Sequence, residues 1–85
     1  MGDRTTDPKT QRTVSKRVRW RREELRISQN ELSRRIGLDH TAIAHIEGGR
    51  RLPSIAKLVA LARALDTTTD YLCGLSAQHK SADSK

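Results

Sequence analysis

Two short stretches with helical periodicity lie on either side of Gly37, and this interruption constrains the fold more than any other feature. Leu32 and Ile36 are about one helical turn apart before the glycine, and Ile43 and Ile46 are about one turn apart after it. Glycine readily adopts the left-handed conformation that ends a helix. Two short helices joined by a tight, glycine-containing turn form a helix-turn-helix. The apolar side chains would fix the angle between the helices and leave the outer face of the second one free.

Cap residues and apolar stripes extend this pattern to five helices. Ser28 and Glu31 are spaced as a capping box at the start of the first short helix, and Asp39 and Ser54 are placed to cap two later helices. No segment alternates between apolar and polar residues as a strand would. The sequence therefore predicts an all-α fold. The apolar stripes expected to face the core in the other helices are Val14, Val18 and Leu25, and then Ile55, Leu58, Val59, Ala62 and Leu65. A short fifth helix contains Tyr71, Leu72 and Leu75.

The ends of the chain are polar and lack apolar periodicity. We expect a disordered basic arm over residues 1–13, the helical domain over residues 14–76, and a disordered tail over residues 77–85. The arm contains Arg4, Lys9 and Arg12, which could reach into a groove of DNA, as the arms of some DNA-binding proteins do. An arm that is simply solvated is an equally good interpretation.

The charge of the chain favours a polyanionic partner. The net charge is +7 and the pI is about 10.5, and twelve of the seventeen basic residues are arginines, which form forked contacts with phosphate and guanine. Trp20 and Tyr71 are the only aromatic residues, so a single-strand binder that stacks bases on aromatic side chains is disfavoured. The alternative is a surface charged only for solubility.

Four motifs resemble one known family. SQNEL, IGL, IAHIEGGRRLP and LDTTTDYL, in this order and spacing, are similar to the Xre/Cro/lambdoid phage repressor helix-turn-helix family over residues 14–75. The resemblance implies a five-helix, lambda-repressor-like domain that binds double-stranded DNA and regulates transcription, most often as a repressor that binds a palindromic operator as a homodimer. A phage-type repressor, a restriction–modification controller and an antitoxin all fit, and the lack of a second domain favours the controller. The alternative function is a helical protein-interaction module that does not read DNA.

The resemblance also implies roles for individual residues. The positions that match the base-reading face are His40, Thr41, Ala44 and His45. The positions that match phosphate contacts are Gln29, Arg50, Arg51 and, on the basic first helix, Arg19. Arg22 and Glu47 match a structural ion pair, and Tyr71, Leu72 and Leu75 match a dimer interface.

Four positions depart from the family pattern. Ser33 stands where alanine is usual, and its hydroxyl can bond to a carbonyl of its own helix. Arg26 and Asp66 stand where glycine is common, and Arg21 replaces a residue that is frequently apolar. We therefore expect the packing of the first helix to differ from the family pattern.

Other functions lack the necessary residues. His40 and His45 would point about 140° apart on a helix, which is unsuitable for a shared metal ion. No catalytic triad or glycine-rich phosphate loop is present, so we expect neither an enzyme nor a bound cofactor, metal or small-molecule ligand. Cys73 is the single cysteine, which fits a reducing compartment. No apolar run approaches the roughly 20 residues of a membrane span, so we expect a cytoplasmic protein with no membrane partner.

Overall fold

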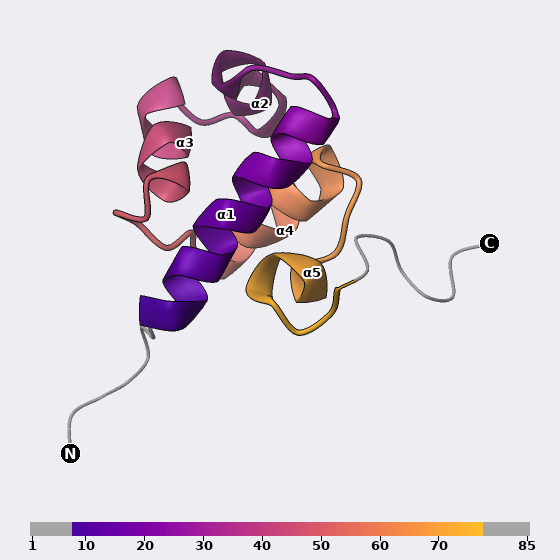
Figure 1. Cartoon of the computed structure of the whole chain (residues 1–85). Coiled ribbons are helices and arrows are strands. Elements are labelled where there is room, and N and C mark those ends of the chain that lie inside the picture. Colours follow the sequence, from indigo (N-terminus) through magenta and orange to yellow (C-terminus); the bar gives the residue numbers. More distant parts are fainter. Residues whose placement is uncertain (1–7, 78–85) are drawn as a thin grey trace.

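The computed structural model describes residues 8–77, and within this range it consists of five helices and no strand (Figure 1). The all-α fold predicted from the sequence is confirmed. Residues 1–7 and 78–85, including Arg4 and nearly all of the predicted tail, lie outside the described residues. The helices are α1 (Pro8–Glu24), α2 (Gln29–Ile36), α3 (His40–Glu47), α4 (Ile55–Ala64) and α5 (Thr69–Cys73).

The long helix α1 crosses one side of the domain and packs against α3 and α5, while α2 packs against α3 and α4 (Figure 1). All five helices contribute side chains to one hydrophobic core. Leu32 of α2 and Ile43 and Ile46 of α3 are fully buried, so these two helices meet through apolar side chains as the helix-turn-helix requires. The other buried apolar residues are Val14, Val18, Leu61, Ala62, Leu65, Tyr71 and Leu72.

The turn between α2 and α3 has the predicted geometry. Gly37 adopts a left-handed conformation with φ of 74°, and the Leu38 N–H donates to the Ser33 carbonyl over 2.9 Å. The Ser33 hydroxyl donates to the Gln29 carbonyl over 2.8 Å, which is the bond expected of a serine at this position. Asp39 occupies the N-cap position of α3, but its side chain makes no capping hydrogen bond.

At the start of α2, the Ser28 side chain makes its capping-box hydrogen bond. The Glu31 N–H donates to the Ser28 hydroxyl over 3.0 Å. The Glu31 carboxylate instead accepts from Arg34 Nη2 (2.6 Å) and Arg35 Nε (3.0 Å) on the next turn of the same helix. These hydrogen bonds lower the pKa of Glu31.

The predicted boundary of the arm at residue 13 is wrong, because α1 begins at Pro8 and residues 8–13 are helical. Proline suits the first position of a helix, where its missing N–H would have no partner. The Gln11 side chain donates from Nε2 to the Gly49 carbonyl (2.8 Å) and attaches this extension to the loop between α3 and α4. The apolar periodicity of the sequence gives no sign of this hydrogen bond between polar groups.

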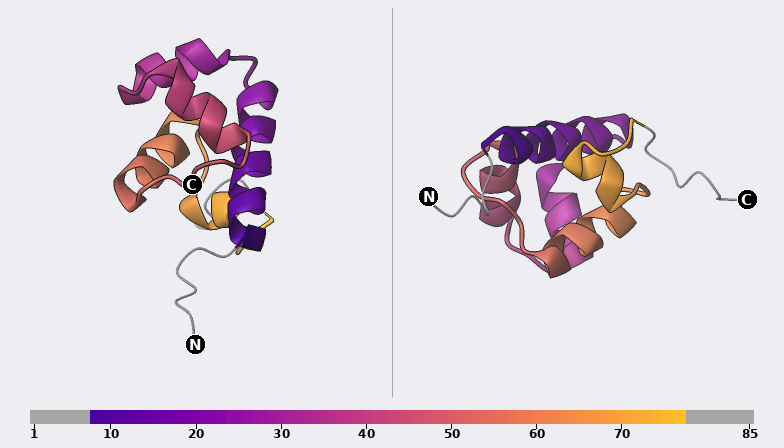
Figure 2. Two further views of the ribbon diagram at one scale, coloured as in Figure 1. Left: turned by 90° about the vertical axis from the view of Figure 1, so that its left-hand side faces the viewer. Right: turned by 90° about the horizontal axis from the view of Figure 1, so that it is seen from below.

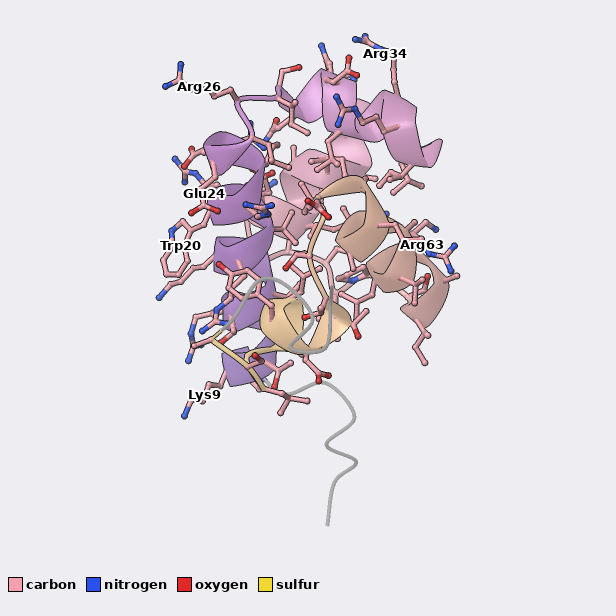
Figure 3. The ribbon with its side chains drawn as sticks, turned by 90° about the vertical axis from the view of Figure 1, so that its right-hand side faces the viewer. Lys9, Trp20, Glu24, Arg26, Arg34 and Arg63 are labelled. Atoms are coloured by element: carbon pink, nitrogen blue, oxygen red, sulfur yellow. The ribbon has the colours of Figure 1, made fainter. Side chains whose placement is uncertain are left out.

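The predicted burial of Ile55 is also wrong, because its side chain is 82% exposed. Ile55 is the first residue of α4, and the core contacts of this helix are made further along, with Leu61 and Leu65 fully buried. Trp20 is exposed on α1 (Figure 3), as is Leu75 after α5. None of the helices in residues 8–77 is long and apolar enough to span a membrane.

Arg21 is buried on α1, where the pattern that the sequence resembles frequently has an apolar residue. Its Nε donates to the Leu65 carbonyl (2.8 Å) and its Nη2 to the Asp66 carbonyl (3.2 Å), at the end of α4. Its Nη1 bonds the Glu24 carboxylate (3.1 Å). Asp66 and Arg26 adopt positive φ angles of 53° and 60°, so the backbone keeps the conformation for which glycine is usual at these positions. The guanidinium therefore satisfies carbonyls that the end of a helix leaves unpaired.

Candidate nucleic-acid interface

The outer face of α3 is at the surface. His40 and Thr41 are exposed and His45 is partly exposed, whereas Ile43 and Ile46 on the opposite face are fully buried. In Figure 2 (left), α3 lies at the front of the domain, with α1 and α4 on either side. Ala44, which is partly exposed, completes the set of four predicted base-reading positions. The structure thus places all four on the free side of α3, and their contacts with bases remain a prediction.

Arg22 and Glu47 form the expected ion pair between α1 and α3. Arg22 Nε and Nη2 donate to the two carboxylate oxygens of Glu47 over 2.6 and 3.0 Å. The side chains are only 13% and 4% exposed. Arg22 Nη1 also donates to the Ile27 carbonyl (2.9 Å), so the pair fixes the loop before α2 as well. The hydrogen bond to Glu47 is the largest cause of the raised pKa of Arg22.

Gln29 joins this pair, a contact that spacing in the sequence does not reveal. Its Nε2 donates to Glu47 Oε1 over 3.1 Å. A primary amide has two N–H donors, so one N–H and the carbonyl oxygen of Gln29 stay available for another partner. The side chain lies at the edge of a surface depression of about 340 Å³, whose lining residues are Arg19, Arg22, Gln29, Ala44, Glu47 and Gly48.

The other predicted phosphate contacts surround the same region. Arg50 and Arg51 are exposed in the loop that follows α3, and the Arg50 N–H donates to the His45 carbonyl (2.9 Å), which fixes the start of this loop. Arg19 lies beside Gln29 in the depression and forms an exposed ion pair with Glu23 of 3.1 Å. The arrangement therefore presents N–H donors and positive charge next to the outer face of α3.

The predicted dimer residues separate into two groups. Leu72 is fully buried and Tyr71 is 8% exposed within the chain's own core, so both side chains stabilise the single chain, and their contact with a second copy stays a prediction. Arg17 holds this end of the domain together, because its guanidinium lies 4.6 Å from the centre of the Tyr71 ring and donates to the Tyr71 and Ser76 carbonyls. Leu75, by contrast, is 80% exposed.

Metal-binding and thiol chemistry have little support in the geometry. Among residues 8–77, no three His, Cys, Asp or Glu side chains lie close enough together to bind a metal ion. Cys73 is partly buried as a free thiol, and its burial raises its pKa. This end of the domain therefore holds Cys73 as a protonated, weakly reactive side chain.

Comparison with known proteins finds a match to the helices that form this surface. A helix-turn-helix family of the Xre/Cro type matches residues 18–72, which include α2, α3 and α4. The chain is 43% identical over 53 residues to an uncharacterised HTH-type transcriptional regulator, y4dL, of Sinorhizobium fredii, and 36% identical over 59 residues to repressor protein C2 of Salmonella phage P22. These matches cover 62% and 69% of this chain but 27% of each relative.

A solved structure extends the similarity. The restriction–modification controller protein C.AhdI from Aeromonas hydrophila superposes with a TM-score of 0.69 at 31% sequence identity. The superposition covers 73% of this chain and 94% of the controller. The two chains therefore share the arrangement of the helices that form the surface described above.

Proposed function

Because this chain belongs to the helix-turn-helix family of transcriptional regulators, we propose that it is a sequence-specific repressor that binds a palindromic operator as a homodimer. Helix α3 would lie in the major groove, where each base pair presents a distinct pattern of donors and acceptors. Helix α2 would cross the DNA backbone above it.

The observation that carries this proposal is the contrast between the two faces of α3. Ile43 and Ile46 hold the helix to the core, whereas on the opposite face His40 and Thr41 are exposed and Ala44 and His45 are partly exposed. Thr41, with His40 and His45, is free to present hydrogen-bonding groups to base edges. Ala44 is suited to contact a thymine methyl group. A good base contact would contribute about 1–3 kcal/mol of discrimination.

The phosphate contacts are proposed for Gln29, Arg50, Arg51 and Arg19. Gln29 is the first residue of α2, where the backbone N–H groups also favour an anion. Its bond to Glu47 fixes the amide in place before DNA arrives, so less conformational freedom is lost on binding. The arginines would supply affinity that decreases steeply with salt concentration.

The homodimer is proposed because a palindromic operator requires two recognition helices about 34 Å apart. Since Leu72 and Tyr71 are buried within one chain, Leu75 is the most exposed member of the predicted set. Its 80% exposure is consistent with burial against a second copy. Among the three biological settings, a restriction–modification controller is supported by the superposition with 94% of C.AhdI.

Selection of bound sequences from random duplex DNA, followed by mobility shifts on the selected site, tests this function. We expect an inverted repeat, a complex containing two protomers, and loss of specific binding in the variant Thr41→Glu with His45→Glu, because carboxylates repel the DNA backbone. The matched control is Ile55→Glu with Ala56→Glu at the exposed start of α4, which also adds two negative charges.

Two results would contradict the proposal. Binding that survives the α3 double substitution, or no shift even at low salt, would favour the alternative function of a protein-interaction module. A selected site without symmetry, or a monomer in the complex, would contradict the palindromic operator and the homodimer while leaving DNA binding intact.

A further inference from the structure

The six residues by which α1 exceeds the predicted domain change the role of Arg12. In a flexible arm, Arg12 could reach into a groove, but here it belongs to the second turn of a regular helix that begins at Pro8. A helix, about 10 Å across with its side chains, cannot enter the minor groove of B-DNA, which is about 6 Å wide. Any contact of Arg12 with DNA is therefore made from a helix whose backbone stays outside that groove.

The start of α1 is fixed against the loop that connects α3 to α4. Gln11 Nε2 donates to the Gly49 carbonyl over 2.8 Å. One turn later, Ser15 Oγ lies 3.8 Å from the position that a Cβ on Gly49 would occupy. Arg50, a proposed phosphate contact, follows directly in the chain. Figure 2 (left) shows this loop next to α1. The first turns of α1 extend past the loop, and in this view α3 lies at the front of the domain.

Helical geometry gives the direction of the Arg12 side chain. Arg12 and Arg19 are seven residues apart, so they lie on nearly the same face of α1, about 20° apart around the axis and about 10.5 Å apart along it. Arg19 lines the depression beside Gln29 and Gly48. Arg12 therefore continues the row of basic side chains from the depression past the α3–α4 loop.

Arg12 also has no side-chain partner among the residues that the structure describes. Its side chain is exposed and has no hydrogen-bond or ion-pair partner in the described part of the chain, in contrast to Arg19, which pairs with Glu23. A guanidinium that is held on a rigid helix, faces solvent and has no counter-ion is suited to bind phosphate.

We infer that the first two turns of α1 form an additional phosphate-binding element, in which Arg12 contacts the DNA backbone next to the phosphates bound by Arg50. This inference rests on the proposed function and extends its contact surface. Because phosphate oxygens are the same at every base pair, the contact adds affinity without sequence preference. It also lengthens the protected stretch of DNA at one edge of each half-site.

The variant Arg12→Gln tests this, with Arg63→Gln as the matched control. Arg63 is also exposed, has no side-chain partner in the described residues, and projects from α4 on the opposite side of the domain from α1 (Figure 3). Both variants lose one positive charge, so they change the net charge equally. Affinity for the selected operator and for random duplex DNA is measured between 50 and 200 mM salt, with thermal melts to verify that both variants are folded.

We expect Arg12→Gln to make the plot of log affinity against log salt less steep by about 0.9 for each bound protomer. Between 50 and 200 mM salt, the affinity of the variant should therefore fall by a factor about 3.5 times smaller per protomer than that of the wild type. Operator and random DNA should weaken by the same factor, and ethylation interference should lose one phosphate per half-site. If Arg12→Gln behaves like Arg63→Gln, or if it alters sequence preference, the inference is overturned while the proposed function stands. If the wild-type protein binds no duplex, the proposed function is overturned first.

Discussion

Replacing Glu47 with glutamine tests the part of the interface that the core supports. The substitution keeps the shape of the side chain and removes its charge, which leaves the Arg22 guanidinium, 13% exposed, without its counter-ion. Removing one partner of a buried ion pair costs about 3–5 kcal/mol. We expect the lower end, about 3 kcal/mol, because Arg22 keeps some solvent and its bond to the Ile27 carbonyl. For a domain of this size that corresponds to a fall in Tm of about 12–24 °C.

Chemical denaturation and thermal melts measure this loss, with Glu23→Gln as the control. Glu23 also pairs with an arginine of α1, but its side chain and that of Arg19 are 52% and 61% exposed, so that pair contributes under about 1 kcal/mol. If Glu47→Gln destabilises the protein no more than Glu23→Gln does, the reasoning about burial is refuted.

A double variant separates the stability of the pair from its role in binding. Arg22→Met with Glu47→Leu replaces both charges by apolar groups, and such replacements are often close to neutral in stability. We expect it to recover most of the stability lost by Glu47→Gln. The DNA affinity of the double variant should nevertheless be lower than that of the wild type, because Gln29 loses the carboxylate that holds its amide. Wild-type affinity in the stable double variant would show that the fixed position of Gln29 does not matter.

Three further predictions concern stability and reactivity. Ile43→Ala should cost about 2–5 kcal/mol in denaturant unfolding because Ile43 is fully buried, whereas Ile55→Ala should change stability by under about 0.5 kcal/mol; equal effects would contradict the assigned burial. The pKa of Glu31 is lower in the folded state, so its ion pairs stabilise the fold above the ordinary glutamate pKa. This stabilisation is lost as the pH falls through the lowered pKa. In Glu31→Gln, Tm should therefore decrease less with acidification than in the wild type. Since burial raises the pKa of Cys73, the folded protein should react with iodoacetamide at pH 8 more slowly than the urea-unfolded protein, and equal rates would contradict this.

The parts of the fold that were predictable depend on local signals. Gly37 ends α2 in a left-handed conformation, Ser28 caps its start, and the spacing of Ile43 and Ile46 places one face of α3 in the core. Each of these features depends on residues within four or five positions of one another, so periodicity and turn chemistry reveal them. The Arg22–Glu47 pair spans 25 residues, and only its resemblance to a family pattern predicted it.

The features that the sequence did not reveal depend on contacts between distant segments. Gln11 bonds to Gly49 across 38 residues and keeps α1 helical back to Pro8, where the apolar pattern gives no signal. Arg17 bonds to the carbonyls of Tyr71 and Ser76, more than 50 residues away, and lies over the Tyr71 ring, which is 8% exposed.

The sequence by itself determined five helices and the helix-turn-helix, because caps, glycine and apolar spacing act over a single turn of backbone. The tertiary structure alone decided where α1 begins, which apolar side chains stay exposed, and which arginines are committed to carbonyls and carboxylates. The physical reason is that a polar side chain has several possible partners of similar strength, and only the packed arrangement of helices brings one of them within hydrogen-bond distance.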